Sequence, residues 1–131
     1  MMIETSRFGP LEVDEHRLIT FPKGILGFPD QPRYALVQTA ENSCFYWLQA
    51  VERPDLAFVV CDPRLFVPDY CVPVKLDELS QIHLQDPSAA QVFIIINKVD
   101  NILTGNLQGP LVVNVETREA RLVRAGEAVA M

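Results

Sequence analysis

The chain has 131 residues, of which 49% are hydrophobic and 21% are charged. This length fits one ordinary domain, and the hydrophobic share excludes an intrinsically disordered protein. Its 17 acidic residues outnumber the 11 basic ones, so the formal net charge is −6. Only Arg118, Arg121 and Arg124 bring basic residues close together. Because nucleic-acid binding needs a basic surface that displaces counterions, direct binding of DNA or RNA is disfavoured.

The sequence carries no sign of membrane insertion or secretion. Its longest apolar run, Leu56 to Cys61, is far shorter than the roughly 20 residues of a membrane-spanning helix. The first residues lack the basic and apolar regions of a secretory signal. The cysteines, Cys44, Cys61 and Cys71, form no C-x-x-C pair and lie in or beside apolar runs. This pattern is typical of buried free thiols in a reducing compartment, so we expect a cytoplasmic protein.

Ten prolines and six glycines interrupt the sequence at short intervals, with Val, Ile, Phe, Tyr and Leu between them. Proline disrupts helix interiors and central ladder positions, so the spacing predicts short strands joined by turns. The predicted strands are Met2–Thr5, Leu11–Asp14, Arg17–Phe21, Tyr34–Thr39, Phe45–Val51, Leu56–Cys61, Gln91–Val99, Ile102–Leu107, Leu111–Glu116 and Ala120–Arg124. Leu56–Val60 and Val92–Ile96 are apolar on both faces, which predicts central positions in a sheet.

The C-terminal half adds a hairpin and the only predicted helix. The last two strands flank Thr117–Glu119 and are expected to pair around it. A helix is predicted over Leu76–His83, and Asp86–Ser88 has the residues that open a second short turn. We expect residues 1–124 to form a single mostly β domain whose two packed or strongly bent sheets close the core. Residues 125–131 are expected to be a frayed tail.

The residue types of catalytic and metal sites do not gather in any recognisable pattern. His16 lies in a charged turn and His83 on the predicted helix, and two histidines without further ligands at the right spacing do not make a zinc site. Cys61 precedes an Asp-Pro turn, where a buried cysteine is favoured over a nucleophile. Phosphate-binding and hydrolase motifs are absent. We therefore expect no enzyme, no catalytic or metal residues and no cofactor.

The segment Phe21–Asp30 is unusual because two glycines flank two aliphatic residues between aromatic ones. Gly24 and Gly27 permit positive φ, while Phe21, Ile25 and Phe28 can turn inward. One interpretation is a tightly packed connection. The other is a loop that closes over a small molecule in the apolar interior of a β-barrel, which is the alternative function class.

An ordered set of motifs then resembles a known family. The motifs are Phe21-Pro22-x-Gly24-Ile25-x-Gly27-Phe28, Tyr46-Trp47-Leu48-Gln49, Leu56-Ala57-Phe58, Asp62-Pro63, Phe66, Asp69-Tyr70 and Asn106-Leu107-x-x-Pro110-Leu111-x-x-Asn114. From about Ile3 to Val123 the chain resembles the bacterial flagellar assembly factor FliW. It departs from the family pattern at Gly109, where Ala is usual, at Ala50, where Ser is common, and at Arg121, where Gln is expected.

The resemblance implies a small β-rich pseudo-barrel with short, strongly bent antiparallel strands, one or two short helices and no catalytic site. It also implies two protein partners. One is flagellin, bound in the cytoplasm before export. The other is CsrA, the translational repressor of flagellin mRNA, which proteins similar to this one bind and antagonise. No contact with nucleic acid, membrane or small-molecule substrate is implied.

Aromatic residues beside carboxylates give the candidate partner-binding surface. Pro68 and Pro73 bracket a short segment that is predicted to lie at an edge, where aromatic side chains stay exposed. Phe66, Asp69 and Tyr70 are therefore the first candidates, and Glu52 and Asp55 are candidate rim charges facing a basic partner. The alternative surface is Asn106–Asn114, although both asparagines are more typical of side chains that satisfy backbone groups.

Overall fold

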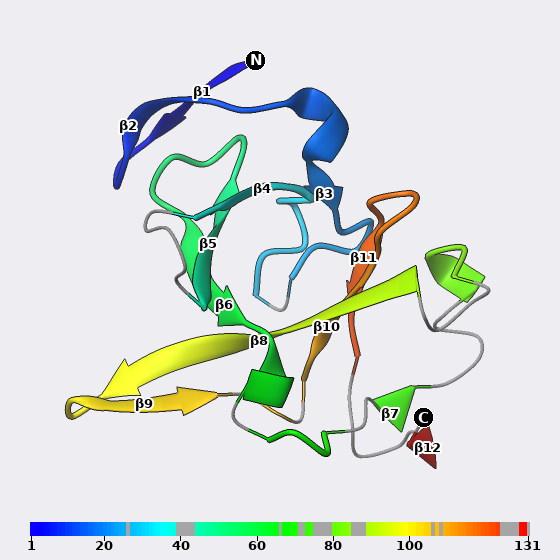
Figure 1. Ribbon diagram of the computed structural model, residues 1–131. Helices are drawn as coiled ribbons and strands as arrows, with labels where there is room; N and C mark the ends of the chain where they lie inside the picture. Colours follow the sequence, from blue (N-terminus) through cyan, green and yellow to red (C-terminus); the bar gives the residue numbers. More distant parts are fainter. Residues whose placement is uncertain are drawn as a thin grey trace.

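Twelve strands and two 3-10 turns make up most of the regular structure of the described residues (Figure 1). The structure is a computed structural model that describes residues 1–25, 27–38, 44–65, 67–70, 73–74, 80–84, 89–105, 107, 109–123 and 129–130. The strands are β1 (Met2–Thr5), β2 (Gly9–Glu12), β3 (Ile19–Thr20), β4 (Arg33–Val37), β5 (Phe45–Ala50), β6 (Ala57–Cys61), β7 (Pro73–Val74), β8 (Ala90–Val99), β9 (Ile102–Gly105), β10 (Leu111–Asn114), β11 (Ala120–Leu122) and β12 (Val129–Ala130). The turns are η1 (Glu15–Arg17) and η2 (Pro63–Leu65).

One large antiparallel sheet curls until its two edges meet. Its strand order is β11-β10-β8-β6-β5-β4-β3, with β9 paired to β8. The edge strand β3 meets the residue just before β11 through an isolated bridge between Thr20 and Glu119, and the Thr20 amide donates to the Arg118 carbonyl at 2.9 Å. We call the line along which β3 and β11 approach each other the seam. The mostly β pseudo-barrel expected from the sequence is confirmed.

The two strands predicted to be central are central. β6 and β8 are neighbours in the middle of the sheet order, with Val60 opposite Ile95. β10 is buried on both faces as well: Leu111 and Val113 belong to the cluster inside the barrel, whereas Val112 joins a second cluster outside it. Strands covered on both faces need apolar residues at every position, which is why their sequences do not alternate.

The segment after β3 fills the inside of the barrel, as Figure 1 shows for the chain between β3 and β4. Phe21 and Ile25 are each 1% exposed, and the Phe28 ring packs edge-to-face on Phe58 at 5.9 Å. Gly24 and Gly27 adopt φ of 67° and 91°, the left-handed region in which glycine avoids a steric penalty. The tightly packed connection is confirmed. Because these side chains are themselves core, the loop plugs the interior and does not act as a lid over it.

Two smaller apolar clusters lie outside the barrel. The β1–β2 hairpin covers one of them, in which Ile3 packs with Leu18 and Ala35. The other joins the chain near Ile82 and Leu84 to the outer side of β8 and β10. Both clusters bury apolar residues on the outer face of a sheet whose inner face is already buried, so the barrel wall is covered on both sides at these places.

Several predicted strands are shifted or shortened at their N-terminal side. β2 begins at Gly9 and ends at Glu12, not over Leu11–Asp14, because the Thr5 hydroxyl bonds the Phe8 amide and the Gly9 carbonyl and sets an earlier turn. The prediction of a strand from Arg17 was wrong. The Asp14 carboxylate accepts from the His16 amide at 2.9 Å and caps η1, so the strand is limited to Ile19–Thr20.

The later strands end earlier than predicted. β4 ends at Val37 within the described residues, and β9 stops at Gly105 instead of Leu107. β10 stops at Asn114 instead of Glu116, because the Asn114 side chain accepts from the Glu116 amide and starts the turn into β11. That hairpin around residues 117–119 is confirmed.

The predicted helix and tail fall largely on residues outside the described ranges. Residues 75–79 and 85–88 are not described, and of Leu76–His83 the described part is helical only at Ser80 and Gln81. In the tail, Val129 and Ala130 pair with Val74 and Pro73, which differs from the fraying expected there. Two-residue strands carry no periodic pattern, so the sequence offered no signal for this pair. In the described part of the chain, no helix has the length and apolar character needed to cross a membrane.

Candidate functional site

The end of η2 and the segment after it present apolar side chains next to a carboxylate. Leu65 is 58% exposed and Val67 is 37% exposed, and Asp69 is also exposed. The Tyr70 amide donates to the Val67 carbonyl at 2.9 Å, which fixes the turn. Phe66 lies outside the described residues. Exposed aliphatic residues beside a charge are the composition of a protein-binding patch, and we call Leu65, Val67, Asp69 and Tyr70 the η2 surface.

Tyr70 anchors this surface and does not project from it. Its ring is half-buried against the cluster that contains Ile82, and its hydroxyl donates to the Leu107 carbonyl. Burial raises the pKa of the Tyr70 hydroxyl, so it stays protonated and keeps donating at neutral pH. The sequence prediction placed the exposed apolar character on aromatic residues. In the described part of the segment, the exposed apolar side chains are Leu65 and Val67. Their exposure results from a turn that the periodicity of the sequence does not predict.

The candidate rim charges lie in the turn between β5 and β6. Glu52 is bound by Arg33 at 2.6 Å, and Asp55 by Arg53 at 3.1 Å. All four side chains are strongly exposed, so each pair contributes at most about 1 kcal/mol to stability. The buried Gln49 amide nitrogen lies 3.1–3.3 Å from four carbonyl oxygens of this turn and holds its backbone.

The two groups of candidate residues do not form one cluster. Asp55 precedes β6 and η2 follows it, and a strand of this length separates its ends by roughly 15 Å. A partner that touches both groups must therefore lie along the whole of β6. A helical segment of about ten residues spans that distance.

The alternative surface around Asn114 is structural. Asn114 is 2% exposed, its amide donates to the Ile82 carbonyl at 3.0 Å, and its oxygen accepts from the Glu116 amide. These bonds tie the β10–β11 turn to the chain near Ile82, as the sequence suggested. Asn106 lies outside the described residues.

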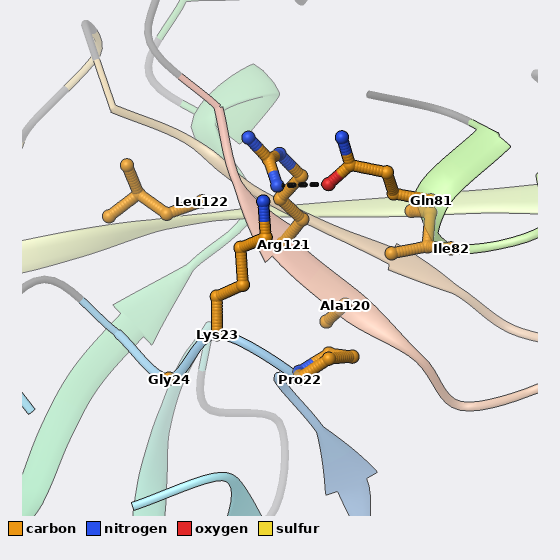
Figure 2. Close-up of a pocket in the computed structure, with 8 residues that line it drawn as sticks. All are labelled: Pro22, Lys23, Gly24, Gln81, Ile82, Ala120, Arg121 and Leu122. Carbon is orange, nitrogen blue, oxygen red and sulfur yellow. Dashed lines mark hydrogen bonds between the residues drawn. The ribbon is translucent and has the colours of Figure 1, made fainter. Parts of the chain in front are cut away.

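A cavity of about 480 Å³ opens at the seam (Figure 2). Pro22, Lys23 and Gly24 line one side of it and Ala120, Arg121 and Leu122 the other, with Gln81 and Ile82 beside them. The Arg121 guanidinium donates to the Gln81 side-chain oxygen. Sequence reasoning missed this cavity, because its three parts are separated by tens of residues and share no motif.

Another cavity, of about 600 Å³, has Ile19, Tyr46 and Phe93 among its lining residues, together with Arg17 and Arg118. The Arg118 guanidinium donates to the Arg17 carbonyl at 2.7 Å. Burial and the neighbouring Arg17 lower the pKa of Arg118 from its usual value. Two like charges thus line the cavity close together, and Asp62 also lines it.

The nucleophilic and metal-ligating side chains are dispersed. Cys61 is fully buried, and burial, followed by nearby Cys44 and Asp62, raises its thiol pKa to about 11. The interpretation of Cys61 as a buried core cysteine is confirmed. Cys44 is half-exposed, contrary to the expectation of burial, and Cys71 is not described. His83 is a surface residue paired with Glu119 at 2.7 Å. In the described ranges, no three His, Cys, Asp or Glu residues are grouped so as to hold a metal ion.

The curled antiparallel sheet, with its interior filled by the chain's own loop, defines a small β-barrel protein. Apolar and charged side chains are exposed at the turns of this barrel. The sequence profile of the FliW protein family matches residues 2–123. The chain therefore belongs to the FliW family of flagellar assembly factors, as its motifs suggested, and its place is in flagellum assembly.

Individual relatives agree with this assignment. The flagellar assembly factor FliW of Alkaliphilus metalliredigens is 36% identical over 92% of this chain and 76% of its own length. That of Heliobacterium modesticaldum is 37% identical over 94% of this chain and 82% of its own length. A crystal structure of the flagellar assembly factor FliW superposes with a TM-score of 0.88 at 28% identity, covering 99% of this chain and 92% of that one.

Proposed function

We propose that this chain binds flagellin in the cytoplasm before export and binds the translational repressor CsrA, which it antagonises. Flagellin then competes for the chain, so that flagellin synthesis follows export and assembly. The observation that carries the proposal is the match to the FliW family over residues 2–123, nearly the whole chain. Of the motif residues that the structure describes, Phe21, Ile25 and Leu48 lie in the core of the barrel.

The charge of the chain favours a basic partner such as an RNA-binding repressor. A formal net charge of −6 repels RNA and attracts a protein whose surface is built to bind RNA. Glu52 and Asp55 are exposed at the β5–β6 turn, each beside one arginine. Exposed ion pairs exchange partners at little cost, so these carboxylates remain accessible to a cationic partner. The chain would thus act on the repressor protein and not on its message.

The η2 surface favours an amphipathic segment of the kind expected at the ends of unassembled flagellin. Leu65 and Val67 offer apolar contact, and Asp69 offers a charge at its margin. An amphipathic helix binds through a few apolar anchors placed on one face. Phe66, Asp69 and Tyr70 remain the proposed centre of this contact, with Tyr70 as the fixed wall against which the anchors pack.

Calorimetric titration of the chain with CsrA and with flagellin from the same organism tests the proposal. We expect saturable binding to each, and displacement of CsrA when flagellin is added to the preformed complex. Binding to neither at tens of micromolar, where even transient regulatory contacts are measurable, would contradict the function. Binding of both partners at once would contradict the competition.

A double variant tests the η2 surface. Val67→Ser with Asp69→Asn should weaken partner binding at least fivefold, because it removes one apolar anchor and the adjacent charge. The matched control is Ile102→Ser with Asp100→Asn, which makes the same changes on the exposed β8–β9 hairpin. Unchanged melting temperatures would show that both variants fold. Equal affinities of the two variants for the partner would place the contact elsewhere.

A further inference from the structure

Arg17 and Arg118 line the cavity of about 600 Å³, which we call the arginine cavity. The Nη2 group of Arg118 donates to the Arg17 carbonyl at 2.7 Å, so the two residues lie side by side. The Nε atom of Arg118 is buried and has no hydrogen-bond partner in the described part of the chain. Burial, and then the charge of Arg17, lower the pKa of Arg118. The Arg118 guanidinium is therefore incompletely bonded and is repelled by its neighbour.

The carboxylates around these arginines are engaged elsewhere. Among the described residues, neither Arg17 nor Arg118 takes part in an ion pair. Asp62 also lines the cavity, but its carboxylate accepts from a backbone amide of η2 at 2.9 Å. In a neighbouring cavity that both arginines also line, Glu12 is paired with the N-terminal ammonium at 3.0 Å and Asp14 caps η1. A half-buried cation without a counter-ion is costly, and an anion that binds beside it offsets the cost.

The arginine cavity also has apolar side chains that solvent reaches. Leu65 is 58% exposed and Val115 is 45% exposed, and both line the cavity. Leu36 and Tyr46 line it as well; both are half-buried and pack against the cluster inside the barrel. The cavity thus offers accessible apolar contact and uncompensated positive charge in one concave space.

We propose that the arginine cavity binds a small organic acid, a single carboxylate carried on a short aliphatic chain. The guanidinium groups of Arg17 and Arg118 donate to the carboxylate, and the aliphatic chain packs on the accessible apolar side chains. A volume of about 600 Å³ is typical of small-molecule sites, which span roughly 300–1,000 Å³ and combine a mostly apolar lining with a few polar groups. The site requires neither CsrA nor flagellin, and of the η2 surface only Leu65 lines it.

Amide chemical shifts of the 15N-labelled full chain, titrated with octanoate, test this. We expect saturable shifts at Leu36, Tyr46, Leu65 and Arg118. Octanamide keeps the chain without the charge and should bind about fivefold more weakly or worse, because it loses the charge-assisted bonds. Acetate keeps the charge without the chain and should bind about tenfold more weakly or worse, because it buries fewer CH2 groups.

Each comparison has an outcome that contradicts the site. Octanamide that binds as tightly as octanoate would overturn the role of the arginines. Acetate that binds as tightly would show an adventitious ion only. Shifts confined to other residues, or no saturable shift at millimolar octanoate, would overturn the proposal as a whole. The peptide Ac-Leu-Glu-Leu-NH2 distinguishes a free acid from an acidic side chain of a protein, and tighter binding of this peptide than of octanoate would overturn the assignment to a small acid.

Charge-removal variants locate the carboxylate. Arg17→Gln and Arg118→Gln should each weaken octanoate binding about three- to tenfold, because each removes one charge-assisted contact. Arg17 is exposed, so its variant is expected to fold even if Arg118→Gln lowers the melting temperature. Arg64→Gln is the matched control, since Arg64 is exposed next to Leu65 and does not line the cavity. Unchanged binding by Arg17→Gln, or an equal loss with Arg64→Gln, would overturn the proposal.

An apolar variant locates the aliphatic chain. Leu65→Ser should weaken octanoate binding about threefold or more and leave acetate binding unchanged, because it removes apolar contact only. Val67→Ser is the matched control: it removes an exposed aliphatic side chain of the η2 surface that does not line the cavity. An equal loss of octanoate binding in the two variants would overturn the placement of the chain. Because Val67→Ser changes the proposed partner contact and not the cavity, failure of the acid site is distinguishable from failure of partner binding.

Discussion

Replacing the two glycines of the interior loop by alanine should separate backbone strain from steric exclusion. Both have positive φ, 67° at Gly24 and 91° at Gly27, and an L-residue held there loses about 1–2 kcal/mol. A Cβ at Gly27 meets no atom within 4 Å, so Gly27→Ala should lose only that amount. At roughly 4 °C per kcal/mol for a domain of this size, its melting temperature should fall by about 4–8 °C.

Gly24→Ala adds a collision to the same strain. The new Cβ would lie 2.3 Å from the Phe28 carbonyl oxygen and 2.6 Å from the Pro29 Cα, and both are backbone atoms. The loop must move, and Ile25 and Phe28 with it, which costs a further 1–3 kcal/mol or so. The expected loss in unfolding free energy is about 2–5 kcal/mol.

Urea denaturation followed by the fluorescence of Trp47, the only tryptophan, measures both losses. The indole packs on the Phe8 ring at 6.0 Å and under the Arg7 guanidinium at 4.0 Å, so unfolding changes its surroundings. Losses for the two variants that agree within about 0.5 kcal/mol would refute the reasoning, because they would show that the close approach at Gly24 costs nothing.

Two further predictions concern single buried side chains. Burial raises the Cys61 thiol pKa from 9.0 to about 11, so the folded state holds a proton that the unfolded state releases first. The stability due to the neutral thiol is therefore complete below about pH 8 and lost as the pH rises from 9 to 11. In urea titrations from pH 8 to 10.5, the stability advantage over Cys61→Ala should shrink, and a constant difference would contradict the assignment. Asn114→Ala should lower the unfolding free energy by about 2–3 kcal/mol, because it leaves the Ile82 carbonyl and the Glu116 amide without their partner. The exposed Asn97→Ala is its control, and equal losses would show that the Asn114 bonds contribute nothing.

Local signals in the sequence predicted a mostly β domain and its central strands, whereas the pseudo-barrel was implied by the family resemblance. The apolar runs at Leu56–Val60 and Val92–Ile96 can be buried on both faces only in the middle of a sheet, and β6 and β8 lie there. The sequence also indicated positive φ at Gly24 and Gly27, because glycine is the residue that adopts this conformation without a steric penalty. The charged turn around His16 was predicted, but its extent was not: Asp14 was taken as the end of one strand and Arg17 as the start of the next, although an aspartate two residues before a free amide also caps a turn.

The candidate site was less accessible to sequence reasoning. Aromatic content pointed to Tyr70, yet the exposure of a side chain depends on what packs against it, here the cluster around Ile82 and the carbonyl of Leu107. Leu65 and Val67 carry no pattern that distinguishes an exposed aliphatic residue from a buried one. The seam cavity joins residues near positions 23, 81 and 121, and only the closure of the barrel brings these together.

The bridge between Thr20 and Glu119 also determines when the barrel can close during synthesis of the chain. Arg118 reaches back 101 positions to the Arg17 carbonyl, and contacts between such distant positions form slowly, since a long loop must close before they stabilise anything. While the chain is being synthesised, β3, β4, β5 and β6 can pair as they emerge, but β3 has no neighbour on its other side until β11 is made. A nascent chain thus exposes an apolar trough lined by Ile19, Phe21 and Tyr34 for most of its synthesis. Its last 15 or so residues before Val123 turn that trough into a barrel, and premature termination anywhere upstream leaves an open, aggregation-prone edge.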